Sequence, residues 1–375
     1  MSGPDGHALT MTADRLDELF AALASRGYVC VGPTVRDGAI VYDRIERGAD
    51  LPRGWTDEQA PGNYRLKKRD DAAYFGFVVG PHSWKKYLFP PERRLWQLKR
   101  TGRSFERLDE PAETPRYAFI GVRACEIAAL DVQDRVFTGG PFVEPQYAAA
   151  RRDAFIVAVN CTQSAATCFC VSMNTGPAAR HGYDLSLTEL LEPEHGFVIR
   201  AGSEQGRDVL AALNASPATA GHEHAEAEGI RRAARQSRTL ETVGIKELLQ
   251  RHYESAQWEE VATRCLSCAN CTLACPTCFC SSVDDTTDLT GDHAERWQRW
   301  DSCFNPEFSY IHGGEVRKTT ASRYRQWMTH KLSTWFDQFG TSGCVGCGRC
   351  ITWCPVGIDL TDEARKMREV DEARS

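Results

Sequence analysis

The sequence predicts an α/β region at residues 1–210, followed by an α-helical dicluster ferredoxin region at residues 241–375. The first region is indicated by two short apolar runs, Arg116–Val122 and Ala154–Val159, with a helical pattern at Cys125–Val136 between them. Strand, helix and strand in this order form a unit whose strands are usually parallel. The second region is indicated by a pattern of four cysteines and a proline that occurs twice in the last third of the chain.

Further elements follow from local patterns. Leu16, Leu19, Phe20 and Leu23 recur at helical spacing, which predicts an amphipathic helix from about Ala13 that stops at Gly27. The other expected elements are a hairpin of Tyr28–Val31 and Val35–Tyr42 turning at Asp37-Gly38, a strand at Tyr74–Val79, and helices at Val243–Tyr253 and Ser322–Leu332. Residues 211–240 are predicted to be a linker or a loosely packed helical spacer, because they contain few large apolar side chains.

Composition excludes several classes of protein. The formal net charge is -6, so there is no global positive charge of the kind that binds nucleic acid or an anionic membrane. No apolar run reaches the roughly 18 residues of a membrane span. The first residues, Met1 to Asp5, lack the order of a secretion signal, so we expect a cytoplasmic protein with reduced thiols. Its 16 cysteines then need a role other than disulfides, and metal binding is the leading one.

The two cysteine patterns match the bacterial ferredoxin motif in spacing. They are Cys265, Cys268, Cys271 and Cys275 before Pro276, and Cys344, Cys347, Cys350 and Cys354 before Pro355. In two-cluster ferredoxins the fourth cysteine of each motif serves the other cluster. We therefore expect one 4Fe-4S cluster on Cys265, Cys268, Cys271 and Cys354, and another on Cys344, Cys347, Cys350 and Cys275. The alternative is a structural zinc site in a binding protein, but zinc motifs do not normally carry a third and fourth cysteine plus proline.

The segment between the motifs, residues 276–343, is much longer than the hairpin insert of a small ferredoxin. Its helical pattern favours a helical ferredoxin domain over the small sandwich.

A third set of cysteines follows the predicted strands. Cys125 comes after the first strand, Cys161 after the second, and Cys168 and Cys170 lie in the loop beyond. Because the carboxyl ends of parallel strands meet at one edge of a sheet, these four thiols are expected to converge and hold a third 4Fe-4S cluster. The alternative is that they are small buried core residues, as free cysteines often are.

Four cysteines and a basic stretch remain. Cys30 is predicted to be a core residue, and Cys278, Cys280 and Cys303 are interpreted as packing near the clusters, with a further metal site as the alternative. From Tyr64 to Arg107 there are twelve Lys and Arg against four Asp and Glu. This stretch is either a solvated face or a docking surface for an acidic protein partner.

No glycine-rich dinucleotide turn, phosphate loop or NiFe-type pair of cysteine motifs is present. We therefore expect a chain that carries electrons and has no active site of its own.

Several segments resemble a known family. They are Gly80–Lys86, Gly121–Glu126, Cys161–Pro177, Trp300–Cys303 and Cys344–Pro355. Together they are similar to the iron-sulfur beta subunit of soluble NADP-linked NiFe hydrogenases of the sulfhydrogenase type. The resemblance implies a chain that relays electrons between two partners. One is the NiFe dimer of large and small subunits, and the other is a flavin subunit that binds NAD(P). The electron-transfer subunit of anaerobic sulfite reductase has a similar layout, and this sequence alone leaves the two open.

Overall fold

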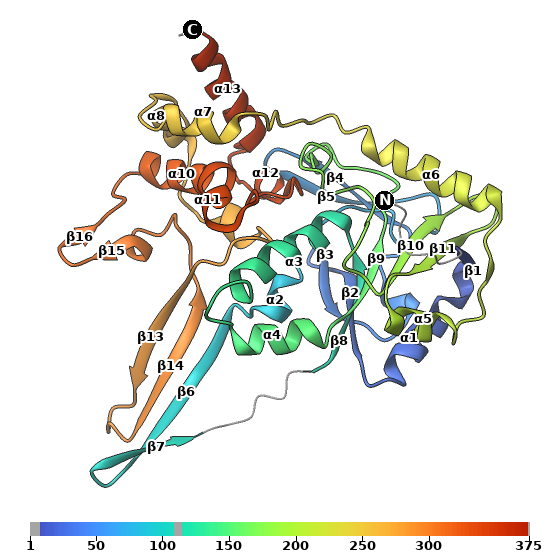
Figure 1. The fold of residues 1–375 in the computed structure, drawn as a ribbon, viewed down its shortest axis with the longest axis horizontal. Coiled ribbons are helices and arrows are strands. Elements are labelled where there is room, and N and C mark those ends of the chain that lie inside the picture. Colours follow the sequence, from blue (N-terminus) through green and yellow to red (C-terminus); the bar gives the residue numbers. More distant parts are fainter. Residues whose placement is uncertain (1–7, 109–114, 374–375) are drawn as a thin grey trace.

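The computed structural model describes residues 8–108 and 115–373. The prediction made from Met1 to Asp5, that the chain carries no secretion signal, falls outside these residues. Its centre is an eight-stranded mixed sheet in the order β12-β1-β11-β10-β9-β8-β2-β3 (Figure 1). The strands are β1 (Leu9–Thr12), β2 (Val29–Arg36), β3 (Ala39–Arg44), β8 (Tyr117–Val122), β9 (Phe155–Val159), β10 (Leu185–Leu190), β11 (Gly196–Ala201) and β12 (Ser216–Pro217). The four strands β10, β9, β8 and β2 run parallel, which confirms an α/β region with parallel strands.

The connection from β8 to β9 carries two helices rather than one. The chain leaves β8 into α3 (Ala124–Phe137) and continues through α4 (Pro145–Arg152) before β9. β8 and β9 pair in parallel, from Ala118 opposite Phe155 onward. Both strands therefore end at the same edge of the sheet, and α3 starts directly at that edge.

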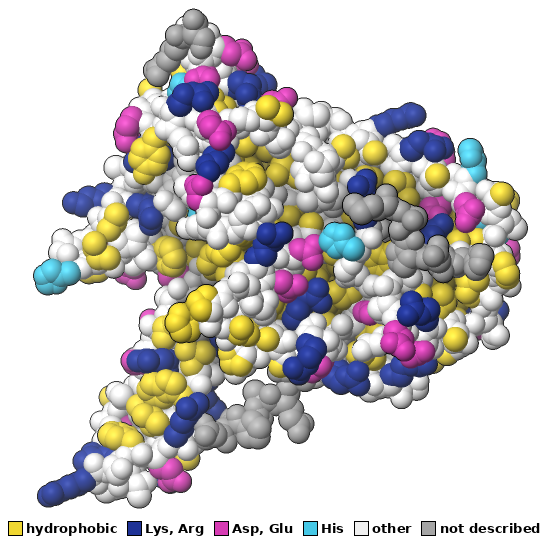
Figure 2. Space-filling model, viewed as in Figure 1, with side chains coloured by type: hydrophobic (Ala, Val, Ile, Leu, Met, Phe, Trp, Pro, Cys, Tyr) yellow, Lys and Arg dark blue, Asp and Glu magenta, His cyan; other side chains and the backbone are white. Residues whose placement is uncertain are grey.

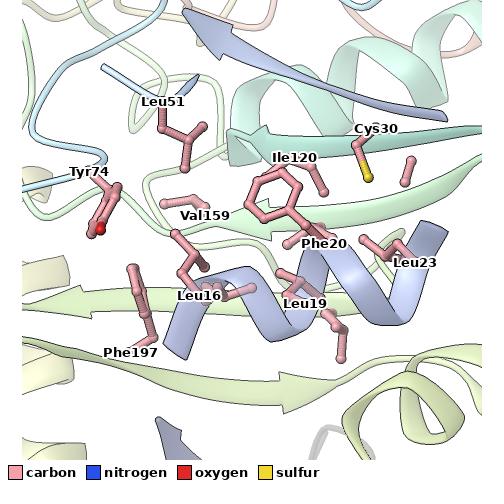
Figure 3. Packing of buried hydrophobic residues seen from close by; sticks show 14 of the residues in the cluster. Leu16, Leu19, Phe20, Leu23, Cys30, Leu51, Tyr74, Ile120, Val159 and Phe197 are labelled. Carbon is pink, nitrogen blue, oxygen red and sulfur yellow. The ribbon is translucent and has the colours of Figure 1, made fainter. Parts of the chain in front are cut away.

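The predicted first helix is confirmed. A short 3-10 turn at Ala13–Arg15 leads into α1 (Leu16–Ala24). Figure 3 shows Leu16, Leu19, Phe20 and Leu23 pointing from this helix toward the sheet, where they meet Ile120, Val159 and Phe197. Cys30 lies in the same cluster with 7% of its surface exposed, so it is a core residue as predicted. The hairpin that follows is also confirmed, because β2 and β3 pair with Arg36 opposite Ala39 around Asp37-Gly38.

The strand predicted at Tyr74–Val79 is wrong. These residues are buried, but they join no sheet. Side chains satisfy their backbone instead: the Glu189 carboxylate accepts hydrogen bonds from the backbone N–H groups of Tyr74 and Phe75 at 2.7 and 2.8 Å. Arg123 Nη2 donates to the carbonyls of Phe75 and Phe77 at 3.0 and 2.9 Å. A buried backbone needs hydrogen-bond partners, and here distant side chains take the place of a ladder.

The segment predicted as a linker or loosely packed helical spacer contains a helix in which Glu226, Gly229 and Ala233 are buried. After α5 (Glu204–Leu210), α6 (Ala220–Ala234) lies against β10 and β11 (Figure 1). The carboxylate of Glu226, which is 6% exposed, accepts hydrogen bonds from Thr188 Oγ1 and Arg200 Nη1 at 2.7 and 2.6 Å. The small side chains that make the segment look linker-like allow the helix to lie close to the sheet.

Helices dominate the C-terminal region. They are α7 (Ile245–Arg251), α8 (Gln257–Arg264), α9 (Asn270–Leu273), α10 (Thr320–Thr329), α11 (Trp335–Phe339), α12 (Arg349–Thr352) and α13 (Leu360–Glu372), with a π-helical turn at His330–Thr334 between α10 and α11. The predicted helix at Val243–Tyr253 contains α7, and the one at Ser322–Leu332 covers most of α10 and enters the π-helical turn. Their shared core is built on Trp258, Tyr324, Trp327 and Met328.

A second sheet joins the two regions. β6 (Glu92–Thr101) and β7 (Ser104–Leu108) come from the N-terminal region, and β13 (Ser281–Thr287) and β14 (His293–Trp300) from the C-terminal region, in the order β13-β14-β6-β7. This sheet extends from the body as an arm (Figure 1), and its visible face mixes hydrophobic with Lys and Arg side chains (Figure 2). Smaller elements are α2 (Lys85–Leu88) and the hairpins β4 (Trp55–Ala60) with β5 (Asn63–Lys68) and β15 (Tyr310–Ile311) with β16 (Gly314–Glu315).

Candidate iron-sulfur centres

The two cysteine motifs adopt the same backbone shape. In the first, Ser267 and Ala269 have positive φ angles of 52° and 66°. In the second, Gly346 and Gly348 occupy the equivalent positions at 66° and 77°. A short helix follows each turn, α9 in the first motif and α12 in the second. The backbone N–H two residues after the first cysteine points back at its sulfur in both loops, at 3.4 Å to Cys265 Sγ and 3.5 Å to Cys344 Sγ.

The fourth cysteine of each motif lies beside the first three of the other. Burial raises the pKa of the Cys271 thiol, and Cys265, Cys354 and Cys268 raise it further. Burial likewise raises the pKa of Cys350, with added effects from Cys344, Cys347 and Cys275. Such electrostatic effects require proximity. The third cysteine of each motif thus lies near the fourth cysteine of the other motif, as the ferredoxin pattern requires, and the two sets adjoin, because Cys275 also acts on Cys271 and Cys271 on Cys350.

The first set surrounds a small cavity with apolar walls. Cys265, Cys268, Cys271 and Cys354 line it, together with Cys350 of the second set and with Phe304, Tyr324 and Trp327 from the helical core. The four thiols of the first set are the donors that a 4Fe-4S cluster needs. These residues therefore fit the cofactor.

The third predicted set also converges. Cys125 lies in the first turn of α3, Cys161 follows β9, and Cys168 and Cys170 lie in the next loop. Burial raises the pKa of the Cys125 thiol, and Cys170, Cys347 and Cys161 add to the rise. Two polar side chains reach these sulfurs: Gln236 Nε2 donates to Cys170 Sγ at 3.1 Å, and Arg123 Nη1 lies 4.0 Å from Cys161 Sγ. Cys125 also shares one apolar cluster with Cys168 and Cys170.

The third set packs directly against the second motif. A Cβ at Gly346 would lie 2.6 Å from the Phe169 carbonyl oxygen, and one at Gly348 would lie 2.4 Å from that of Thr167. The backbone N–H of Phe169 donates to the Gly346 carbonyl at 2.9 Å. Glycine therefore serves two purposes here, the positive φ of the loop and the close approach of the neighbouring loop. The thiols of Cys347, Cys125, Cys168 and Cys170 share one apolar cluster.

A buried ion pair fixes the second motif to α3. Arg349, between two motif cysteines, is fully buried and pairs with Glu126, which is 1% exposed. Arg349 also donates to the carbonyls of Gly80 and His82 at 2.9 and 2.8 Å. The Glu126 carboxylate accepts further hydrogen bonds from Tyr42 Oη at 2.8 Å and Trp84 Nε1 at 3.0 Å. This network holds the cysteine loops of the two regions in one arrangement.

The comparisons with known proteins bear on this arrangement. Residues 264–358 match the family model of the 4Fe-4S dicluster domain. The chain is 30% identical over 293 residues to sulfhydrogenase 2 subunit beta of Pyrococcus furiosus, an alignment that covers 76% of this chain and 82% of that protein. The chain belongs to the family of sulfhydrogenase beta subunits. No solved structure matches it.

In this member of the sulfhydrogenase beta-subunit family, both motifs lie within the matched dicluster domain, whereas the third set lies outside it. Within residues 8–108 and 115–373, no group of three or more His, Cys, Asp or Glu side chains is close enough to hold a single metal ion. Four thiolates around one zinc ion lie about 2.3 Å from it, whereas the thiolates of a 4Fe-4S cluster bind separate irons. Thiols that bind one zinc ion must therefore lie closer together than thiols that bind the separate irons of a 4Fe-4S cluster.

Sequence reasoning missed the charged residues around the thiols. Arg349 lies inside a motif, Arg123 and Glu126 lie in the Gly121–Glu126 segment of the family resemblance, and Lys331 lies in the predicted helix Ser322–Leu332, but no pattern placed these charges beside the thiols. Lys331 lies in the π-helical turn and is 4% exposed, and its Nζ donates to Cys275 Sγ at a distance of 3.1 Å.

The basic stretch at 64–107 is not one surface, because Lys85 is buried and Arg93 and Arg94 pair with Glu144 and Glu295. None of the described helices is long and apolar enough to cross a membrane.

Proposed function

We propose that this chain is the cytoplasmic iron-sulfur subunit that relays electrons between the large and small subunits of a NiFe hydrogenase and a flavin subunit that binds NAD(P). The observation that carries the proposal is the pair of complete four-cysteine motifs, each with its fourth cysteine near the other motif, in a member of the sulfhydrogenase beta-subunit family. In this role the chain has no active site of its own and works only with its partner subunits.

The proposed ligands of the first cluster are Cys265, Cys268, Cys271 and Cys354, and those of the second are Cys344, Cys347, Cys350 and Cys275. A third cluster is proposed on Cys125, Cys161, Cys168 and Cys170. The contact of the Thr167–Cys170 loop with Gly346 and Gly348 supports an order in which the second cluster lies between the other two. A line of three centres lets a protein that stands between two partners pass electrons across its own width.

The residues around the thiols suit such a relay. A bound 4Fe-4S cluster takes up and releases electrons, and the protein sets how readily it does so through charge, hydrogen bonds and burial. Lys331 places a positive charge at Cys275, and Arg123 does so near Cys161. Phe304, Tyr324 and Trp327 give the first set an apolar wall, while Cys268 is exposed. The two cations stabilise anionic thiolates, which would be unfavourable in an uncharged apolar site.

Metal analysis of the anaerobically purified chain tests the proposal. We expect iron and acid-labile sulfide in equal amounts, broad visible absorption that bleaches with dithionite, and little zinc. The chain alone is expected neither to evolve hydrogen nor to reduce NADP. Zinc without sulfide would indicate a zinc-stabilised binding protein instead, and hydrogenase activity with no partner detectable by mass spectrometry would contradict the relay role.

The third cluster has its own prediction. Replacing Cys168 and Cys170 together by Ser in the full chain is expected to remove about four irons, because one 4Fe-4S cluster loses two of its ligands. The test uses the full chain because β6 and β14 join the two regions in one sheet. Cys30→Ala, which removes a sulfur from the core, is the matched control and is expected to keep all its iron. A double variant with unchanged iron would mean that these cysteines are core residues.

A further inference from the structure

Three thiols lie outside the proposed clusters and come together at the base of the arm. Cys278 and Cys280 precede β13, and Cys303 follows β14. The base is fixed by the Ser281–Trp300 pair and by a hydrogen bond from Asp301 N to the Cys280 carbonyl at 2.8 Å. The thiols of Cys280 and Cys303 lie close to each other, and that of Cys278 lies close to the thiol of Cys275.

Two buried ammonium groups lie beside the segment that carries Cys278 and Cys280. Lys85 is 3% exposed and Lys331 is 4% exposed. Lys331 Nζ contacts Cys275 Sγ, Thr277 Oγ1 at 3.0 Å and the Gly343 carbonyl at 3.3 Å. Lys85 Nζ donates to the Cys278 carbonyl at 3.0 Å and lies 3.7 Å from the centre of the Trp300 ring. In the part of the chain that the structure describes, neither ammonium forms an ion pair with a carboxylate.

Such charges need an anion nearby. A buried ammonium without a counter-ion is costly. Lys85 and Lys331 are both buried beside the Thr277–Cys280 segment. One thiolate, that of Cys275, belongs to the proposed second cluster. A second anionic centre beside Cys278 and Cys280 would complete the charge balance.

The position of Lys331 comes from a local departure from regular helix. The π-helical turn His330–Thr334 interrupts the helix between α10 and α11. Turns of this kind add a residue to one turn and are frequent at functional sites. Here the turn carries the side chain that reaches the thiols.

A repeated tetrapeptide connects these thiols with the proposed third cluster. Thr-Cys-Phe-Cys occurs at 167–170 and again at 277–280. Both copies contact the second motif, the first through Phe169 N to the Gly346 carbonyl at 2.9 Å and the second through Thr277 Oγ1 to the Gly343 carbonyl at 2.7 Å. The two loops therefore flank the same cysteine motif.

We propose that Cys278, Cys280 and Cys303 hold a fourth iron-sulfur cluster beside the second one. Three cysteines leave one iron for a ligand from outside the chain, and the two ammonium groups favour an anionic sulfur or oxygen ligand there. This inference goes beyond the proposed function, which needs only a line of three clusters. It makes the second cluster a branch point with one neighbour in each tetrapeptide loop.

Iron and sulfide counting on the anaerobically reconstituted full chain tests it. Cys278→Ser/Cys280→Ser and Cys303→Ser are each expected to lose roughly three or four irons relative to wild type. Cys168→Ser/Cys170→Ser, the same change in the other tetrapeptide, is expected to lose the roughly four irons of the third cluster and to keep the fourth cluster. Cys30→Ala is expected to lose none.

Unchanged iron in either arm-base variant overturns the inference, as does one zinc per chain that disappears with them. If these variants do not fold, the iron content of the wild-type chain is the test. More than about twelve irons per chain supports a fourth cluster, and about twelve or fewer overturns it. The outcome is separable from that of the proposed function. A chain that keeps its iron in both arm-base variants loses only this inference, whereas a chain without iron or sulfide loses the relay role as well.

Discussion

Replacing Cys347 by Ser is expected to remove about four irons and to destabilise the C-terminal region by at least about 5 kcal/mol. Cys347 is 8% exposed and shares an apolar cluster with Trp335, Val345 and the third-set thiols. Metal binding in small metal-rich domains supplies on the order of 10 kcal/mol of folding free energy, so loss of one cluster removes much of what holds the loops together. The hydroxyl would also be buried among apolar side chains.

Iron analysis and hydrogen exchange measure this effect. In Cys347→Ser, amides of α9, α12 and the motif loops should exchange faster, while those of α1 and the strands β8 and β9 should change little. Cys30→Ala is again the control, because Cys30 belongs to the core between α1 and the sheet. Wild-type iron content together with wild-type exchange in Cys347→Ser would show that this thiol is not a ligand.

Arg349→Met is expected to lower the free energy of unfolding by about 3–5 kcal/mol, because it leaves the Glu126 carboxylate buried without its counter-charge. The guanidinium also supplies hydrogen bonds to the Gly80 and His82 carbonyls, which methionine cannot replace. Equilibrium unfolding in denaturant, monitored anaerobically on the iron-loaded chain, measures the loss. The change is expected without a fall in iron content before unfolding, since the thiols remain.

A double-mutant cycle separates the ion pair from simple packing. Glu126→Gln removes the charge but can still accept from Tyr42 and Trp84, so Glu126→Gln/Arg349→Met should be more stable than Arg349→Met alone. Arg349→Lys, which keeps the charge and loses the planar fork, should fall between wild type and Arg349→Met. Strictly additive effects of Arg349→Met and Glu126→Gln would mean that the pair contributes no coupling.

The limits of sequence reasoning are visible in particular segments. Tyr74–Val79 has the apolar composition of a strand, yet Glu189 and Arg123, both distant in sequence, satisfy its backbone. Residues 220–234 form a helix, as the helical-spacer alternative predicted, but the burial of Glu226 against Thr188 and Arg200 could not be predicted. In both places a long-range side-chain contact decides the structure, and such contacts leave no periodicity in the local sequence.

The cysteine motifs could be predicted because their geometry is local. Two-residue gaps between cysteines require a tight loop, and that loop appears twice with positive φ angles at the same two positions. The ends of the strands at Val122 and Val159 could be predicted for a similar reason, since short apolar runs between turn residues favour buried strands.

What only the tertiary structure decided is how these local parts are joined and charged. The pairing of β6 with β14, the Arg349–Glu126 ion pair and the approach of Lys85 and Lys331 to the thiols each connect residues far apart in sequence. A buried charge is stable only where a partner of opposite charge or a set of hydrogen bonds meets it. The tertiary fold determines which residues meet the buried charge. The spacing of the cysteines therefore predicts which thiols form a site, but it does not predict the charged side chains around them.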